Sequence, residues 1–369
     1  MELKRTSVWS DGFFREWVML HKQLYARESV LAERITDLKD LLGDSSDFPH
    51  DRWIALTVIT GGAIRARALV AVSELHPDTA KVGFIECVDD EASFKFLWKG
   101  VEASARELGA TQLKGPINLH FFVSYRWKTN GDKSPFYSEP QQKSYYLRFF
   151  ESVGMKPLKT WETFRIRFFR SKRQYGEIRQ AKKPEHRLRI RGIDMQRFDQ
   201  EMETIHRLFI ESFKEMSEYE PMPLATFKKI YAGFRYIIGP RYAFIIEHEG
   251  LPVAFCINFM DPLPTLLKRQ RWLPRIPQRL LDLWTWCALK LNHSRLLIMY
   301  VGRLPAPDGK EFKGIQSLVA KKMTLPVALT FPQLYICFTA EDSPALKSYQ
   351  EDQKEHVSSY ALFGKSIQD

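Results

Sequence analysis

The same order of predicted secondary structure occurs twice along the chain, and this repetition limits the fold more than any single motif does. In each half, some segments have apolar residues at helical spacing, and others are strand-like apolar runs joined by Gly-containing turns. The first half is expected to contain helices at 13–27, 29–42, 89–108 and 141–153, and strands at 53–60, 64–75, 81–88, 113–117 and 161–169. The second half is expected to contain helices at 197–213, 225–232, 314–323 and 343–351, and strands at 187–193, 241–247, 251–260, 295–301, 333–338 and 357–364. Two α/β domains of similar architecture follow from this order.

A polar, basic and non-periodic stretch separates the halves. Residues 170–185, RSKRQYGEIRQAKKPE, have the composition of a solvated linker. A chain of 369 residues is long enough for two domains. We therefore expect an N-terminal domain at 1–169, a basic linker at 170–185 and a C-terminal domain at 186–369, which carries a helical insertion at 261–294.

The protein is basic, with a formal net charge of +11 and a pI near 9.3. Such a charge favours anionic partners, which include nucleic acid, anionic lipid and phosphate-bearing cofactors. The sequence contains no zinc-finger, RNP-type or KH-type signature. Nucleic acid is therefore not expected to be the main partner.

The four cysteines, Cys87, Cys256, Cys287 and Cys337, are far apart, and each lies in an apolar segment. No Cys/His spacing matches a metal site, so no metal is expected, and the cysteines are interpreted as buried free thiols in a reducing compartment. The N-terminus has no secretory signal, and no apolar run reaches the ~18 to 20 residues of a membrane span. A cytoplasmic location is expected.

The stretch 295–320, RLLIMYVGRLPAPDGKEFKGIQSLVA, is the strongest candidate for a binding site. A buried strand, a Gly- and Lys-containing loop and a helix start follow one another. Free backbone N–H groups and the helix dipole at such a place attract anions, and Lys310 and Lys313 beside Gly314 suit a phosphate or pyrophosphate. An ordinary strand-to-helix connection with solvated lysines remains the alternative.

Two other segments attract attention by composition. The long loop 118–140 is aromatic and basic and includes Tyr125 and Trp127, so it is interpreted as a lid or a seam between domains, or as a contact with the acceptor. The insertion 261–294 combines basic residues with Trp and Leu. It is either a helical cap on the domain or an interfacial element for an anionic membrane surface or a fatty acyl chain.

A family resemblance rests on three motifs in the stretch Phe84–Met155 and on the end of the chain. The first half contains Gly-Phe-x-Glu at 83–86, Gly-Pro-x-Asn at 115–118, and Tyr145-Tyr146 followed by Gly154-Met155. The second half has Leu208–Pro223 as its opening helix and, near its end, Ala345, Tyr349, Tyr360 and Lys365. These features resemble bacterial tandem proteins related to the GNAT-type N-acetyltransferases. The resemblance implies two tandem acyl-CoA N-acyltransferase (GNAT)-like domains, each an α/β (α+β) unit with a mixed, mostly antiparallel sheet flanked by helices.

In this family the pyrophosphate of acyl-CoA lies on the loop between a central strand and the following helix. In the first half this loop reads Val88-Asp89-Asp90-Glu91-Ala92-Ser93, and its three carboxylates would repel pyrophosphate. We therefore expect the N-terminal domain to be degenerate or structural, and the second domain to bind acetyl-CoA or a longer acyl-CoA as co-substrate. The cofactor-binding residues implied are Val301, Gly302, Lys310, Lys313, Gly314 and Ile315.

The implied reaction is acyl transfer from CoA to an unidentified amine. The resemblance assigns Tyr349 as the general acid for the leaving thiolate, and Tyr300 is a lesser candidate. Tyr125, Trp127, Tyr145 and Tyr146 are the expected acceptor or lid residues. Glu86 lies among apolar residues on a strand, where an inward-facing carboxylate would be unusual.

Two alternatives to this enzyme activity remain open. Both phosphate loops depart from the family pattern, so a non-catalytic GNAT-like binding or scaffold protein is one alternative. The other is a Fem-type transferase that uses aminoacyl-tRNA, since the net charge of +11 permits a tRNA partner.

Overall fold

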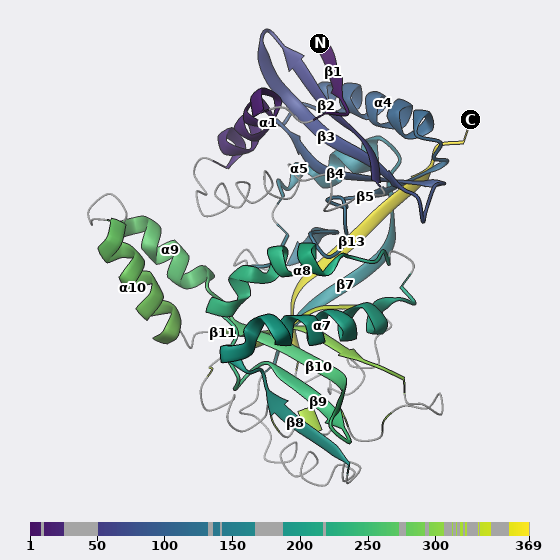
Figure 1. Cartoon of the computed structure of the whole chain (residues 1–369). Helices are drawn as coiled ribbons and strands as arrows, with labels where there is room; N and C mark the ends of the chain where they lie inside the picture. The colour runs from purple at the N-terminus through teal and green to yellow at the C-terminus, as the bar shows by residue number, and fades with distance from the viewer. Residues whose placement is uncertain are drawn as a thin grey trace. The chain divides into compact units, whose positions relative to one another are not determined.

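The structure is a computed structural model that describes residues 1–8, 11–25, 51–131, 136–140, 142–166, 187–216, 219–272, 278–291, 295–305, 333–340 and 354–368, with single positions between 312 and 331 (Figure 1). The chain divides into two compact units. Unit 1 comprises Met1–Gly131, Ser138–Trp161 and Ser359–Asp369, and unit 2 comprises Asp132–Tyr137 and Glu162–Ser358. The expected linker at 170–185 and the expected helices at 29–42 and 343–351 lie outside the described residues.

Unit 1 is a sheet covered by helices on both faces. Its elements are β1 (Glu2–Thr6), α1 (Asp11–Leu24), β2 (Asp51–Thr60), β3 (Ala63–Ser73), β4 (Thr79–Cys87), α4 (Glu91–Glu107), β5 (Gln112–Gly115), β6 (Trp127–Gly131) and α5 (Tyr145–Ser152). Trp17 of α1 packs with Leu69 and Ala71 of β3. The intervening residue Val70 belongs to a second cluster, which includes Phe94 and Leu97 of α4. Because successive strand residues face opposite sides, both parities must be apolar, which explains the long apolar runs.

Unit 2 repeats this plan. Its elements are β8 (Leu188–Gly192), η3 (Met195–Arg197), α7 (Phe198–Phe213), α8 (Leu224–Tyr231), η4 (Ala232–Tyr236), β9 (Phe244–His248), β10 (Leu251–Met260), α9 (Leu263–Trp272), α10 (Gln278–Leu291), β11 (Arg295–Arg303) and β12 (Gln333–Ala340). Figure 1 shows α7 lying across β10 and β11, with which it is in contact. The strands β7 (Lys156–Ile166) and β13 (Lys354–Ser366) each have residues in both units.

The strands are mixed and mostly antiparallel, as expected, but they form one sheet rather than two. The order is β1-β2-β3-β4-β5-β13-β7-β12-β11-β10-β9-β8, with β6 paired to β13. β4 pairs with β5 in parallel, and β11 pairs with β12 in parallel. These parallel pairs occupy corresponding places in the two halves of the order, so the repeat of elements predicted from the sequence is also a repeat of topology.

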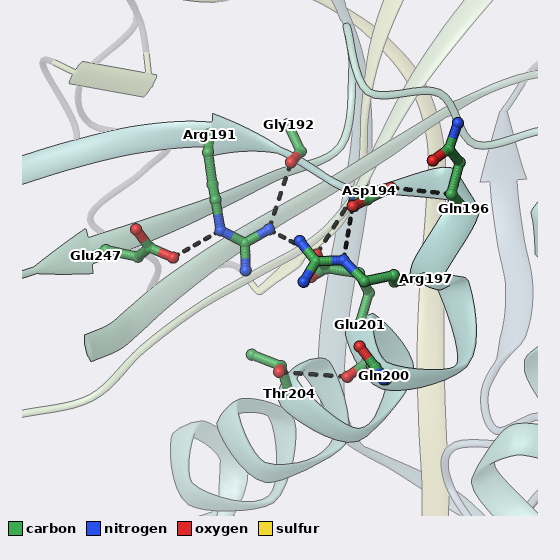
Figure 2. Close-up of polar contacts among 9 residues, drawn as sticks. All are labelled: Arg191, Gly192, Asp194, Gln196, Arg197, Gln200, Glu201, Thr204 and Glu247. Atoms are coloured by element: carbon green, nitrogen blue, oxygen red, sulfur yellow. Dashed lines mark hydrogen bonds and ion pairs between the residues drawn. The ribbon is translucent and has the colours of Figure 1, made fainter. Parts of the chain in front are cut away.

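An arginine network holds the start of α7 to the sheet of unit 2 (Figure 2). Arg191 on β8 donates from Nε to Glu247 of β9 at 2.6 Å and from Nη1 to Glu201 of α7 at 2.7 Å. Glu201 is buried, so its charge needs these partners. Asp194 caps η3 by accepting from the Gln196 N–H and also binds Arg197. The network therefore fixes the helix that packs over the end of β11.

The insertion 261–294 is a pair of helices, α9 and α10, that contact each other. The buried carboxylate of Asp261 starts it: Oδ1 accepts from the N–H groups of Leu263 and Tyr137 at 3.1 and 3.0 Å, and Oδ2 lies 3.1 Å from Arg295 Nε. Figure 1 shows the two helices extending away from the strands of unit 2.

Three details differ from the sequence-based expectations. β1 was not expected, because ELKRT has little apolar character, and it pairs in an antiparallel register with β2. β6 lies inside the segment 118–140 that was expected to be a loop. Cys287 is exposed rather than buried, while Cys87, Cys256 and Cys337 are buried as predicted.

Candidate functional site

The parallel strands β11 and β12 of unit 2 separate along their length. Pairing runs from Arg295 with Gln333 to Ile298 with Ile336, and beyond this point both strands continue, to Arg303 and Ala340 respectively. All residues of both strands are described. On the other side of β11 the register with β10 shifts between the pairs Ile257–Tyr300 and Asn258–Ile298, which is a β-bulge at Met299. A bulge bends a strand and redirects its backbone, so β11 turns where its pairing to β12 ends.

The backbone of β12 has an unusual conformation on its side of the opening. Phe338 has a φ of 53°, in the left-handed region that bulky residues avoid. Its N–H donates to Thr163 Oγ1 of β7 at 3.2 Å rather than toward β11. Strained backbone of this kind persists only where surrounding contacts hold it, and it is concentrated at functional sites.

Burial decreases where the strands separate. Leu296 and Leu297 are fully buried, Met299 and Tyr300 are half-buried, and Val301 is 55% exposed. The ring of Tyr300 lies 5.3 Å from that of Phe209 on α7 and 6.2 Å from that of Tyr231 on α8, both edge to face. The opening therefore has an aromatic wall on the α7–α8 side.

The other predicted residues of this region differ in what the structure places around them. A methyl group on Gly302 would lie 2.7 Å from Phe255 Cζ and 2.8 Å from Ser212 Oγ, so packing alone requires glycine there. Phe312 and Ile315 are buried in a cluster with Leu188, Ile246, Val253 and Ala254. Phe312, which lies in the predicted phosphate loop, therefore contributes to the core. Lys310, Lys313, Gly314 and Tyr349 lie outside the described residues.

In unit 1 the parallel strands β4 and β5 occupy the place that β11 and β12 have in unit 2, and hydrogen bonds continue beyond their paired residues. Pairing of β4 with β5 is in register from Thr79–Gln112 to Lys81–Lys114. Beyond it, the Ile117 N–H donates to Val82 O at 2.9 Å, and the Phe84 N–H donates to Asn118 Oδ1 at 2.8 Å. Asn118, the last residue of the Gly-Pro-x-Asn motif, thus accepts the hydrogen bond of a β4 backbone N–H.

The start of helix α4 in unit 1 already holds an anion of its own. The Asp90 carboxylate accepts from the Ala92 N–H at 3.2 Å and from Ser93 Oγ at 2.5 Å. The hydrogen bond from Ser93, followed by those from backbone N–H groups, lowers the pKa of Asp90 despite some burial. A phosphate at this helix terminus would have to displace a bound carboxylate of the same sign of charge.

Glu86, at the inner face of β4, is the centre of a buried polar cluster. It is 7% exposed, and its Oε1 lies 2.6 Å from His21 Nδ1 of α1. Tyr146 of α5 donates to Glu86 Oε2 at 2.6 Å and accepts from the Cys87 N–H at 2.9 Å. Arg67, only 1% exposed, is close enough for its charge to interact with Glu86 and donates to Trp17 O at 2.5 Å.

The ionisation of these groups follows from their burial. Burial, and then the charge of Glu86, raises the pKa of Tyr146 well above its ordinary value, so the phenol stays protonated and able to donate. Burial lowers the pKa of Arg67, and the neighbouring Glu86 opposes this effect. Burial also raises the pKa of the Cys87 and Cys256 thiols to about 12, which makes them poor nucleophiles at neutral pH.

The remaining acceptor or lid candidates also lie in unit 1. Trp127 is buried, with its ring 4.2 Å from that of Phe150. Tyr125 is half-buried and has the guanidinium of Arg126 stacked 3.9 Å above its ring. Tyr145 donates to Cys87 O at 2.8 Å. The structure therefore joins Tyr146 to Glu86 and Tyr145 to the neighbouring Cys87, but it places Tyr300 in the other unit.

The sequence alone identified Glu86 and Tyr146 but missed His21 and Arg67. His21 and Glu86 are 65 positions apart, so no local pattern could join them. Among the described residues, no group of three or more His, Cys, Asp or Glu side chains could hold a metal ion. None of the helices in that part of the chain has the length and hydrophobicity needed to span a bilayer.

Sequence comparison gives one relative of partial length. No family model matches the chain. Protein YghO of Escherichia coli K12 is 25% identical over 218 residues, which are 57% of this chain and 55% of that protein. The chain therefore matches only about half the length of this curated relative.

Comparison with solved structures gives matches over the whole chain. A tandem GNAT protein from the clavulanic acid biosynthesis pathway superposes with a TM-score of 0.56 at 13% identity, covering 100% of this chain and 99% of that one. A GCN5-related N-acetyltransferase of Anabaena variabilis and a probable N-acyltransferase of Enterococcus faecalis each give a TM-score of 0.55, at 8% and 10% identity. Each covers 100% of this chain and 73% of the other. The chain has a tandem GNAT-like fold.

Proposed function

We propose that unit 2 transfers an acyl group from acyl-CoA to an amine, with the pantetheine arm in the opening between β11 and β12. The observation that carries this proposal is the separation of these strands after Ile298 and Ile336, combined with the bulge at Met299. Parallel strands normally stay paired, and a bulge beside such a gap leaves backbone groups directed toward a ligand.

Residues of β11 and of the segment that follows it are assigned roles in this proposal. Lys310, Lys313 and the N–H groups at Gly314 hold the pyrophosphate, because cations and a helix start favour an anion there. The β11 backbone near Val301 orients the thioester carbonyl and stabilises its developing negative charge. Tyr300 forms the aromatic wall on the acceptor side.

The reaction needs a neutral amine and a protonated leaving group. The amine nitrogen bonds to the thioester carbon, the carbon–sulfur bond breaks, and the sulfur takes a proton from the phenol of Tyr349. The proton lost from the amine goes to water, and Tyr349 regains its proton from water. The buried thiols Cys87 and Cys256 take no part as nucleophiles, which favours direct transfer. Free thiols also suit the cytoplasm, where we place the reaction.

We infer that unit 1 binds no acyl-CoA. The Asp90 carboxylate accepts a hydrogen bond at the helix terminus. Asn118 accepts from the Phe84 N–H and Tyr146 accepts from the Cys87 N–H, so these backbone groups are already bonded. One site per chain is therefore expected.

Isothermal titration calorimetry of the full chain with acetyl-CoA and with a long-chain acyl-CoA tests the proposal. The expected result is one equivalent bound. Replacing Lys310 and Lys313 together by alanine should weaken binding about tenfold or more, since a charge-assisted hydrogen bond contributes roughly 1.5–3 kcal/mol. Lys99→Ala, an exposed lysine on α4, is the matched control and should have no effect.

The alternatives predict different results in the same experiment. A chain that stays folded but binds neither acyl-CoA would be a scaffold. Binding of a charged tRNA without binding of acyl-CoA would support the Fem-type transferase instead.

A further inference from the structure

The α9–α10 hairpin exposes an unusual concentration of apolar side chains. In the described part of the chain, thirteen large hydrophobic side chains are exposed, and five of them lie in this hairpin. They are Leu267 (48% exposed), Leu280 (58%), Leu283 (59%), Trp284 (38%) and Leu291 (76%). Scattered exposed hydrophobic residues need no explanation, but a cluster of them on one element indicates an interaction surface.

The apolar residues of α10 form a stripe on its outward face. Leu280, Leu283, Trp284 and Leu291, together with the exposed Cys287, fall within an arc of roughly 100° at 3.6 residues per turn. Thr285, which is buried, lies on the opposite side of the same helix. A helix that packs on a core shows the reverse pattern, with apolar residues inward and polar residues outward.

The charge of the insertion indicates the partner. Residues 261–294 contain six Lys and Arg residues and two Asp residues. One of these two, Asp261, is buried and paired with Arg295, so the surface of the hairpin is more basic than the count suggests. Lys268, on α9, is exposed. Exposed Leu and Trp residues in a basic segment are the composition of helices that lie in the interface of an anionic bilayer.

We propose that the α9–α10 hairpin binds the surface of an anionic lipid bilayer. The stripe defined by Leu280, Leu283, Trp284 and Leu291 enters the boundary between headgroups and acyl chains, and the cations contact lipid phosphates. The hairpin lies on the surface rather than crossing it, since α10 spans 14 residues against the ~20 that a crossing needs. The stripe shares no residue with the strands β11 and β12, so the proposal does not rest on the transferase activity.

Vesicle co-sedimentation of the full chain tests this proposal. Vesicles of phosphatidylcholine alone are compared with vesicles containing one quarter phosphatidylglycerol, at about 0.1 M and 0.5 M salt, over which the screening length falls about twofold. The expected result is binding to the anionic vesicles that weakens at high salt. Leu283→Glu with Trp284→Glu should lower the bound fraction at least tenfold, and Lys268→Glu should lower it severalfold.

The matched control is Leu251→Glu, which changes a leucine that is 70% exposed at the β9–β10 turn, outside the hairpin. It should leave vesicle binding unchanged. Circular dichroism should show that every variant keeps its fold, because the changed side chains are exposed. Equal binding by the wild type and the Leu283/Trp284 variant would overturn the proposal. So would a chain that ignores vesicles but forms a dimer that Leu283→Glu dissociates, because the stripe would then bind a second copy.

Discussion

The hydroxyl group of Tyr146 satisfies two buried groups at once, and this gives a test of the cluster around Glu86. Tyr146→Phe would leave Glu86 Oε2 and the Cys87 N–H without the partner they have now. An unsatisfied buried group costs about 1–3 kcal/mol, and more when it is charged. We expect the free energy of unfolding, measured in urea, to fall by at least about 2 kcal/mol.

The neighbouring tyrosine provides the control for this experiment. Tyr145 is half-buried and donates to Cys87 O at 2.8 Å, so Tyr145→Phe removes one hydrogen bond between neutral groups and leaves no buried charge without its partner. Its cost should be about 1 kcal/mol or less. A larger loss for Tyr145→Phe than for Tyr146→Phe would contradict the role given to the Glu86 cluster.

Gly302 is explained by packing, and this explanation can be tested separately from ligand binding. Gly302→Ala should lower the free energy of unfolding by about 1–3 kcal/mol, because the new methyl group would push against the Phe255 ring inside unit 2. Gly233→Ala is the control, since a methyl group there would meet no atom within 4 Å. If both variants were equally stable in urea, the close packing at Gly302 would be wrong.

At the scale of elements, the cap of helix α4 makes stability depend on pH. The pKa of Asp90 is lowered from its ordinary value of 3.8, first by the hydrogen bond from Ser93. A lowered pKa stabilises the folded state at pH values above the unfolded pKa, and this contribution is lost as the pH falls through the folded pKa. Asp90→Asn keeps a capping side chain but cannot titrate.

The stability difference between wild type and Asp90→Asn should therefore shrink as the pH falls from 6 to 3, as measured by urea unfolding at each pH. Asp90→Ala, which removes the cap, should cost about 1 kcal/mol near pH 7. A difference that stays constant over this range would show that the Asp90 carboxylate does not stabilise α4 in its charged form.

Elements with strong periodicity were predicted well, and polar ones were not. The hairpin of β2 and β3 and the helix α4 follow directly from apolar spacing and turn residues, and the insertion was expected to be helical but not to be two helices. β1 and β6 were missed because ELKRT and WKTNG are mostly polar, and such strands form only because a neighbouring strand supplies the pairing partners. The Glu86 cluster could be predicted only in part, because His21 and Arg67 are distant from Glu86 in the sequence and come close to it only in the folded chain.

At the scale of the whole molecule, the order of strands could not be read from the sequence. A repeat of elements suggests two separate sheets, but β13 pairs with β5 of the first half although it is formed by the last residues of the chain. Long-range pairing of this kind leaves no local pattern. The parallel pairs β4–β5 and β11–β12 show instead that the repeat is preserved in topology while the two potential sites differ. In unit 1, Asp90, Asn118 and Tyr146 accept hydrogen bonds from the backbone N–H groups at this place. In unit 2, the strands β11 and β12 separate there instead.

Hydrogen–deuterium exchange of the full chain, with and without acetyl-CoA, tests most directly the claim that the opening of unit 2 receives acyl-CoA. Peptides covering 298–303 and 336–340 should exchange more slowly when acetyl-CoA is present, because a ligand that binds the folded state protects the backbone it covers. Peptides covering 83–91 of unit 1 should be unchanged. Protection at 83–91 without protection at 298–303 would contradict the account.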